Sequence, residues 1–120
     1  MKEKGLRETA RVTHMINEEL IGLMVRRIVD GFAPQQIVVF GSCARGDDQD
    51  DSDLDLLVVM PFAGTKRDVQ VAMRMALRDF DVPVDLILAS PQEIEQKRDV
   101  NGLIYRTAYR EGRIAYERAG

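Results

Sequence analysis

Two aspartates at alternate positions, Asp53 and Asp55, open an apolar segment that continues to Met60. Side chains two residues apart on a β-strand point to the same face, so both carboxylates would lie together at the rim of a core. Such a pair is costly unless a cation neutralises it, and hard oxygen ligands suit Mg²⁺. Two ions about 3.5–4 Å apart are the usual arrangement for in-line phosphoryl or nucleotidyl displacement. The alternative is that the two aspartates only form a solvated acidic rim.

A third carboxylate, Asp85, interrupts the apolar run of residues 82–88. A charged side chain inside a strand needs a partner. If this strand pairs with the strand that carries Asp55, Asp85 can join the same ions. The alternative is a salt bridge from Asp85 to Arg74 or Arg78.

The pair Gly41–Ser42 directly follows the short apolar segment 37–40. Glycine allows a close backbone approach, and a short helix that starts at Ser42 would aim free N–H groups at an anion. A glycine–serine pair alone is more often only a turn. Because this one precedes Asp53 and Asp55 on what we expect to be adjacent strands, it predicts a nucleoside triphosphate site.

The elements that must position these residues follow from hydrophobic spacing and turn signals. Apolar residues recur at four-residue spacing from about Thr13, which predicts an amphipathic helix that ends near Gly31. Residues 1–12 are either a short helix or a frayed arm. The remaining pattern predicts strands over 36–40, 54–60 and 82–89, helices over 65–80, from Ser90 onward and over 101–111, and an extended tail over 113–117. Thr65 with Asp68 has capping-box spacing at the start of the first of these helices, and Ser90, followed by Pro91 and Glu93, predicts an N-cap at the start of the next.

The order of these elements predicts the fold class. The short connection between the first two strands favours antiparallel pairing, and a helix crosses from the second strand to the third. We therefore expect an α+β fold with a small mixed β-sheet flanked by helices. A length of 120 residues predicts a single domain over 1–120.

Composition excludes several classes of protein. The formal net charge of −3 argues against broad nucleic-acid binding, which normally needs a basic face. The single cysteine, Cys43, rules out an internal disulfide and a multi-cysteine zinc site, and we expect it to be inert. No run approaches the roughly 20 apolar residues that span a bilayer, and the N-terminus lacks a signal-peptide core. These features predict a cytoplasmic protein.

Three other side chains have two interpretations each. Tyr105 and Tyr109 lie four residues apart on the last helix, where they form its packing face or else line an adenine pocket or a partner surface. Lys66 begins the helix after the second strand. It is either a solvated helix end or a cation that reaches a triphosphate.

The spacing from Gly41–Ser42 through ten residues to Asp53–Leu54–Asp55 resembles the signature of the DNA polymerase β-like nucleotidyltransferase superfamily. The wider pattern, Gly-Ser-x-Ala-Arg-Gly followed by Ser-Asp-x-Asp-Leu, is similar to that of its minimal nucleotidyltransferase (MNT) branch. The resemblance covers roughly residues 20–117. It implies a polymerase β-like nucleotidyltransferase fold.

The resemblance also implies a role for each matching residue. Nucleotide phosphates would be bound by the turn and its arginine: Gly41, Ser42 and Arg45. Two Mg²⁺ ions would be held by the three acids Asp53, Asp55 and Asp85. Asp85 would in addition help to deprotonate the acceptor hydroxyl. Packing of Arg45 against the acidic loop is an equally open interpretation.

Members of the MNT branch are cytoplasmic and are often encoded beside a HEPN-domain toxin. The resemblance therefore implies an antitoxin that transfers AMP from ATP to a tyrosine of the toxin, with no membrane or direct nucleic-acid partner. A second hypothesis is a binding module with weak catalysis that neutralises its partner by complex formation. A third is a small-molecule transferase of the aminoglycoside type. The sequence leaves a homo-oligomer and a hetero-oligomer both open.

Overall fold

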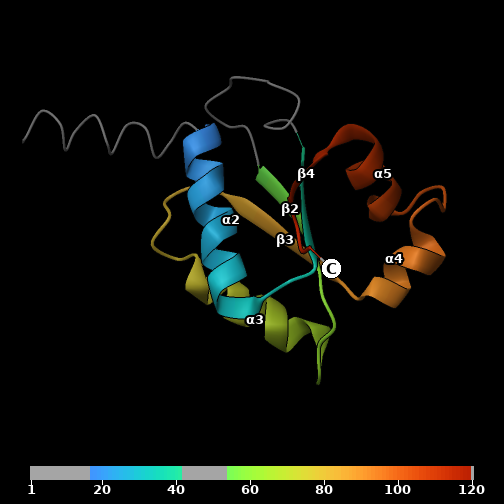
Figure 1. Ribbon diagram of the computed structural model, residues 1–120, viewed down its shortest axis with the longest axis horizontal. Helices are drawn as coiled ribbons and strands as arrows, with labels where there is room; N and C mark the ends of the chain where they lie inside the picture. Colours follow the sequence, from blue (N-terminus) through green and yellow to red (C-terminus); the bar gives the residue numbers. More distant parts are fainter. Residues whose placement is uncertain (1–16, 42–53, 120) are drawn as a thin grey trace, which may run out of the picture.

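The computed structural model describes residues 17–41 and 54–119. Its elements follow one another in this order: α2 (Glu18–Phe32), β1 (Gln36–Phe40), β2 (Leu54–Val59), α3 (Lys66–Ala76), β3 (Val84–Ala89), α4 (Pro91–Lys97), α5 (Ile104–Glu111) and β4 (Arg113–Glu117). The expected α+β class is confirmed: helices flank a small mixed sheet (Figure 1). In the described part of the chain, no helix is long and apolar enough to cross a membrane.

Local capping chemistry explains where the helices begin and end. The side chain of Asn17 accepts the N–H of Leu20 at 2.8 Å at the start of α2. This helix ends at Ala33, which adopts a left-handed conformation with φ of 50°. Thr65 caps α3 in the same way as Asn17 caps α2, and Ser90 forms a capping box with Glu93 at the start of α4. The two caps that the sequence predicted are therefore present.

The sheet has the strand order β3-β2-β1-β4. The expected antiparallel pairing of β1 with β2 is confirmed, and β2 and β3 pair in parallel. Helix α3 makes the crossover between these two parallel strands. The mixed character of the sheet confirms the sequence prediction, and the neighbour relation between the second and third strands, which the sequence left as a condition, is present.

The sheet differs from the expectation at its fourth strand. Residues 113–117, expected as an extended tail, form β4 and pair antiparallel with β1. Gly112 makes this arrangement possible, because a Cβ at this position would lie 2.4 Å from the carbonyl oxygen of Val39 and 2.7 Å from Cβ of Phe40. The chain thus passes from α5 onto β1 with glycine at the point of closest approach.

Three other elements are shorter than the sequence predicted. Helix α3 ends at Ala76 rather than near residue 80, because residues 77–79 continue as a turn. Strand β3 begins at Val84 rather than 82, and α5 begins at Ile104 rather than 101. These differences shift the ends of elements but not their order.

Alternate residues of the sheet face two separate cores. Leu54, Leu56 and Val58 of β2 pack with α2 and α3. Leu57 and Val59 lie in a second cluster with residues of α4 and α5. Figure 1 shows the same two layers, with α2 and α3 on one side of the sheet and α4 and α5 on the other. Since side chains alternate along a strand, Asp55 belongs to the α4–α5 face.

Helix α3 also covers one edge of the sheet. Gln70 Nε2 donates to the carbonyl oxygen of Leu86 at 2.9 Å, and Arg74 Nη1 donates to that of Val84 at 3.5 Å. These carbonyls belong to the outer strand β3, two residues apart, and therefore point the same way. Two side chains one helical turn apart thus occupy acceptors that an open strand edge would present to other chains.

Candidate active site

Asp55 and Asp85 occupy paired positions on neighbouring strands. The parallel register of β2 and β3 places Asp55 directly beside Asp85. Paired residues in a parallel sheet point to the same face, here the one that carries α4 and α5. The condition that the sequence analysis set for Asp85, pairing of its strand with that of Asp55, is met.

Gly41 lies at the same end of the sheet. Phe40, the last residue of β1, pairs with Asp55, and Gly41 follows it with φ of 94°. This backbone conformation suits glycine and strains other residues. Gly41 therefore lies at the end of the strand next to that of Asp55 and two strands from that of Asp85, and the adjacency of β1 and β2 agrees with the sequence prediction.

Three further predicted site residues, Ser42, Arg45 and Asp53, lie outside the described residues, as does Cys43. Their roles stay predictions. Within the ranges 17–41 and 54–119, no group of three or more acidic, histidine or cysteine side chains could hold a metal ion. Asp55 and Asp85 are thus the described part of the predicted three-carboxylate set.

The surroundings of Asp85 differ from the sequence argument. Asp85 is exposed and Asp55 is half-buried. Because β3 begins at Val84, Asp85 lies at the open end of the strand and reaches water, so a charge there needs no protein partner. Among the residues that the structure describes, Asp85 makes no ion pair with Arg74 or Arg78, and Arg74 bonds to the backbone of Val84 instead.

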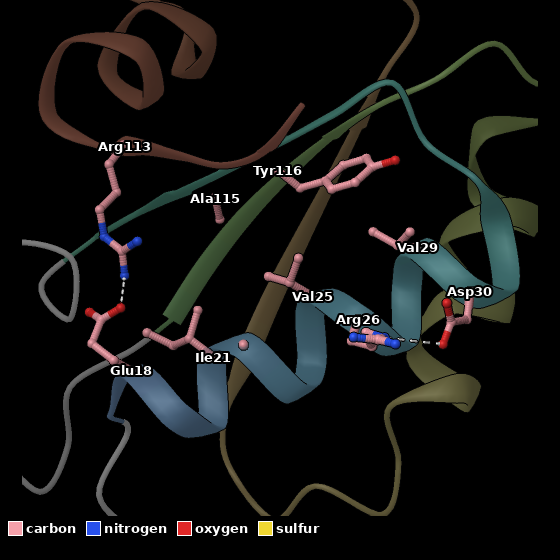
Figure 2. A pocket seen from close by; sticks show the side chains of 10 residues that line it. Glu18, Ile21, Val25, Arg26, Val29, Asp30, Arg113, Ala115 and Tyr116 are labelled. Atoms are coloured by element: carbon pink, nitrogen blue, oxygen red, sulfur yellow. Dashed lines mark hydrogen bonds and ion pairs between the residues drawn. The ribbon is translucent and has the colours of Figure 1, made fainter. Parts of the chain in front are cut away.

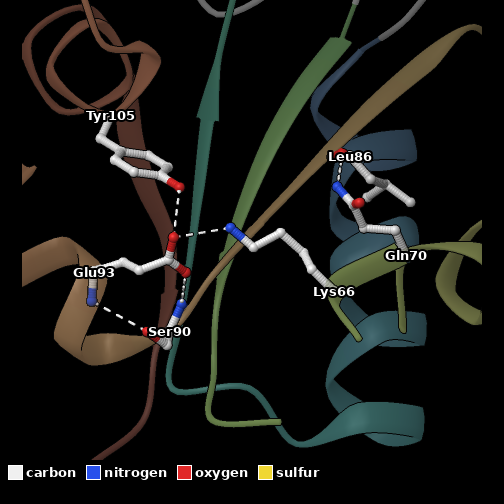
Figure 3. Close-up of polar contacts among 6 residues, drawn as sticks. All are labelled: Lys66, Gln70, Leu86, Ser90, Glu93 and Tyr105. Carbon is white, nitrogen blue, oxygen red and sulfur yellow. Dashed lines mark hydrogen bonds and ion pairs between the residues drawn. The ribbon is translucent and has the colours of Figure 1, made fainter. Parts of the chain in front are cut away.

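A polar cluster on the α4–α5 face extends the predicted Ser90–Glu93 capping box through contacts from Lys66 and Tyr105 that sequence reasoning missed (Figure 3). Its centre is Glu93, whose Oε2 accepts from Lys66 Nζ at 2.9 Å and from the hydroxyl of Tyr105 at 3.3 Å. The other carboxylate oxygen accepts the backbone N–H of Ser90 at 2.9 Å. We call these four residues the Glu93 cluster. It joins the first residues of α3 and α4 to α5, and so fixes two helices over the face that carries Asp55.

The charges of the Glu93 cluster stabilise each other. Burial acts to raise the pKa of Glu93, but the Ser90 N–H and the Lys66 ammonium outweigh it and hold this pKa below its usual value. Burial likewise acts to lower the pKa of Lys66, and the bond to Glu93 reverses the effect, so that the pKa lies above its usual value. Lys66 is therefore a cation paired with Glu93. This pairing matches neither of the two sequence interpretations, a solvated helix end or a cation that contacts a triphosphate.

The two tyrosines of α5 serve packing. Tyr105 is buried in the second core, and Tyr109 is half-buried against it. The hydroxyl of Tyr109 donates to Gln36, and the guanidinium of Arg98 lies 4.0 Å from the centre of its ring. This arrangement agrees with the packing interpretation. Because Arg98 covers one face of the Tyr109 ring, that face cannot stack on an adenine base.

The donor chemistry of the described pair suits a hard divalent cation. Asp55 and Asp85 offer carboxylate oxygens on one face at one end of the sheet. Mg²⁺ is commonly held by one or two carboxylates together with substrate phosphates. A cation held there would be accessible to a substrate from solvent, because Asp85 is exposed.

Comparisons with known proteins identify the fold and the family of the chain. A solved structure of a provisionally assigned nucleotidyltransferase from Sulfolobus solfataricus is similar to this chain, with 26% sequence identity and a TM-score of 0.51. The match covers 83% of this chain and 79% of that one. No curated protein matches the chain significantly. Residues 24–114 match the family model of the nucleotidyltransferase domain, which spans β1, β2 and β3 with both described carboxylates. The chain therefore belongs to the nucleotidyltransferase domain family.

Proposed function

We propose that this protein transfers AMP from Mg²⁺-bound ATP to a hydroxyl group, and that the hydroxyl belongs to a tyrosine of a HEPN-domain toxin that it neutralises. The observation that carries the proposal is the pairing of Asp55 with Asp85 beside the end of β1. Membership of the nucleotidyltransferase family supports the general reaction. The resemblance to the MNT branch supports the acceptor and the antitoxin role.

Each site residue has a part in the proposal. Asp55 and Asp85, with Asp53, would hold the divalent cations through carboxylate oxygens. Bound cations would polarise the phosphate oxygens and offset the charge that develops during displacement. The turn that starts at Gly41 would bind the β- and γ-phosphates through the Ser42 region, with Arg45 as an additional phosphate contact.

Asp85 is the group best placed to assist the acceptor. In the proposed step, the acceptor oxygen bonds to the α-phosphorus, the bond to the β-phosphate oxygen breaks, and pyrophosphate leaves. The proton of the hydroxyl passes to a carboxylate oxygen of Asp85. The exposure of Asp85 supports this role, because a side chain from another protein can reach it from solvent.

A protein acceptor also fits the open position of the pair. Asp85 lies near the start of β3, which is an outer strand of the sheet. The other outer strand, β4, is separated from β2 by β1, so it does not lie next to the pair. We propose the cytoplasm as the location, since the reaction consumes ATP, which is held there.

The test is transfer of label from α-labelled ATP to the purified toxin encoded beside this protein. Wild type should label the toxin only with Mg²⁺ present. Asp55→Asn and Asp85→Asn should each abolish labelling, while Asp99→Asn, which changes an exposed aspartate after α4, should not. Equal labelling by wild type and both site variants would disprove the proposal.

The same variants distinguish a catalytic antitoxin from the binding-module hypothesis. A catalytic antitoxin requires that the Asp55→Asn/Asp85→Asn double variant fails to silence the toxin in cells. A double variant that still binds and fully silences the toxin would favour neutralisation by complex formation.

A further inference from the structure

The two outer strands of the sheet, β3 and β4, differ in whether side chains cover their free edges. Side chains of α3 occupy backbone acceptors along β3. Within the described residues, β4 pairs only with β1, and its other edge has no strand beside it. Ile114 on this strand is 48% exposed. An edge that presents unpaired backbone groups and an apolar side chain is suited to pairing with another chain.

A groove runs along this open edge between α2 and β4, with a volume of about 510 Å³ (Figure 2). Its walls include Ile21, Val25 and Val29 of α2 and Tyr116 of β4. Figure 2 shows charged pairs on the rim, Glu18 with Arg113 at one end and Arg26 with Asp30 toward the other. The groove is therefore apolar along its length and charged at its ends.

The charges on the exposed stripe of α2 are arranged symmetrically about a glycine. Glu18 and Arg26 each lie four residues from Gly22, on opposite sides, so all three share one face of the helix. The side chains of Glu18 and Arg26 are 78% and 81% exposed. A Cβ at Gly22 would meet nothing within 4 Å, so this position has room for a close neighbour.

This pattern is complementary to a second copy of itself. If two α2 helices cross antiparallel at Gly22, Glu18 of one copy faces Arg26 of the partner subunit, and the reverse contact follows by symmetry. Each contact adds to an ion pair within the subunit, Glu18 with Arg113 and Arg26 with Asp30. Ala115, the central residue of β4, lines the same groove opposite this stretch of α2. One twofold axis can therefore relate both the helices and the strand edges.

We propose that the protein forms a twofold dimer in which two copies pair along β4 and pack α2 against α2, with a Glu18–Arg26 contact on each side of the axis. The occupant of the groove is thus a second copy of this chain. The interface lies on the α2 face and the β4 edge, whereas Asp55 and Asp85 lie on the other face. The dimer leaves the carboxylate pair open and does not depend on the proposed function.

Charge reversal tests the proposal in the full-length chain. Light scattering should give twice the chain mass of 13.6 kDa for wild type as the protein concentration rises. Glu18→Lys or Arg26→Glu alone should weaken the dimer by about tenfold or more, because each creates two like-charge contacts between subunits. Each also removes one exposed ion pair within the subunit, with Arg113 or with Asp30, so urea unfolding of each variant measures that separate effect. The double variant should restore it. Glu19→Lys, on the same helix but outside the groove, should leave the dimer unchanged.

A cross-link provides a measurement that does not depend on charge. In a Cys43→Ser background, Gly22→Cys lies on the proposed axis and should form an intersubunit disulfide on oxidation. Leu23→Cys, at the neighbouring exposed position, should not. Circular dichroism confirms that each variant is folded. A wild type that stays monomeric at all concentrations, single reversals that change nothing, or a double variant that is not restored would each overturn the proposal.

Discussion

Asp55 and Asp85 lie side by side in the register of two parallel strands, although 30 positions separate them in the sequence. The crossover through α3 makes this pairing possible, because a parallel connection needs a long return segment. The antiparallel strand β1 brings Gly41 to the same end of the sheet. The topology, rather than any local motif, thus assembles the candidate site.

Replacing Asp85 distinguishes a role in catalysis from a role in stability. Asp85→Asn should lower kcat by about 10²–10⁴-fold, the usual contribution of a positioned acid–base group. The free energy of unfolding should change little, because Asp85 is exposed. Steady-state transfer rates and urea unfolding of the same samples measure both. A kcat within a factor of about two of wild type would contradict the role.

Gly112→Ala should destabilise the protein by about 1–3 kcal/mol or more, because the added methyl group overlaps the backbone of Val39 and the side chain of Phe40. Gly31→Ala is the matched control. A Cβ at Gly31 meets nothing within 4 Å, so alanine in helix α2 should stabilise the protein by about 0.5 kcal/mol. Urea unfolding measures both changes, and equal effects of the two substitutions would refute the close approach at Gly112.

The Glu93 cluster predicts a pH dependence of stability. The folded pKa of Glu93 lies below its unfolded value, so its contribution is full above the ordinary glutamate pKa of about 4.3 and is lost as the pH falls through the folded value. Glu93→Gln should therefore cost about 1–2 kcal/mol at neutral pH, and the difference from wild type should shrink in acid.

Unfolding of both proteins between neutral pH and the acid range measures this difference. Glu95→Gln, at an exposed position of the same helix, is the control and should show no such convergence. A Glu93→Gln difference that stays constant with pH would contradict the charged hydrogen bonds to Lys66 and Ser90.

The sequence was sufficient to predict the parts of the fold that depend on local patterns. Buried apolar runs predicted the three strands β1, β2 and β3, and capping residues predicted the starts of α3 and α4. The sequence predicted the meeting of Asp55 and Asp85 only on the condition that their strands pair, and the structure shows this pairing and its register.

Features that depend on long-range contacts could not be predicted in this way. Residues 113–117 were predicted only as an extended tail, because their pairing with β1 depends on the close approach of Gly112 to that strand. The bond between Lys66 and Glu93 joins two helix starts 27 positions apart. The exposure of Asp85 depends on the residue at which β3 begins.

The most direct test of the account is calorimetric titration of Mg²⁺ into the protein in the presence of a non-hydrolysable ATP analogue. If Asp55 and Asp85 hold the cation together with the nucleotide, wild type binds Mg²⁺ and the Asp55→Asn/Asp85→Asn variant binds at least about 100-fold more weakly, while keeping its fold. Equal affinity of the two proteins for Mg²⁺ would contradict the central claim that this pair is a cation site.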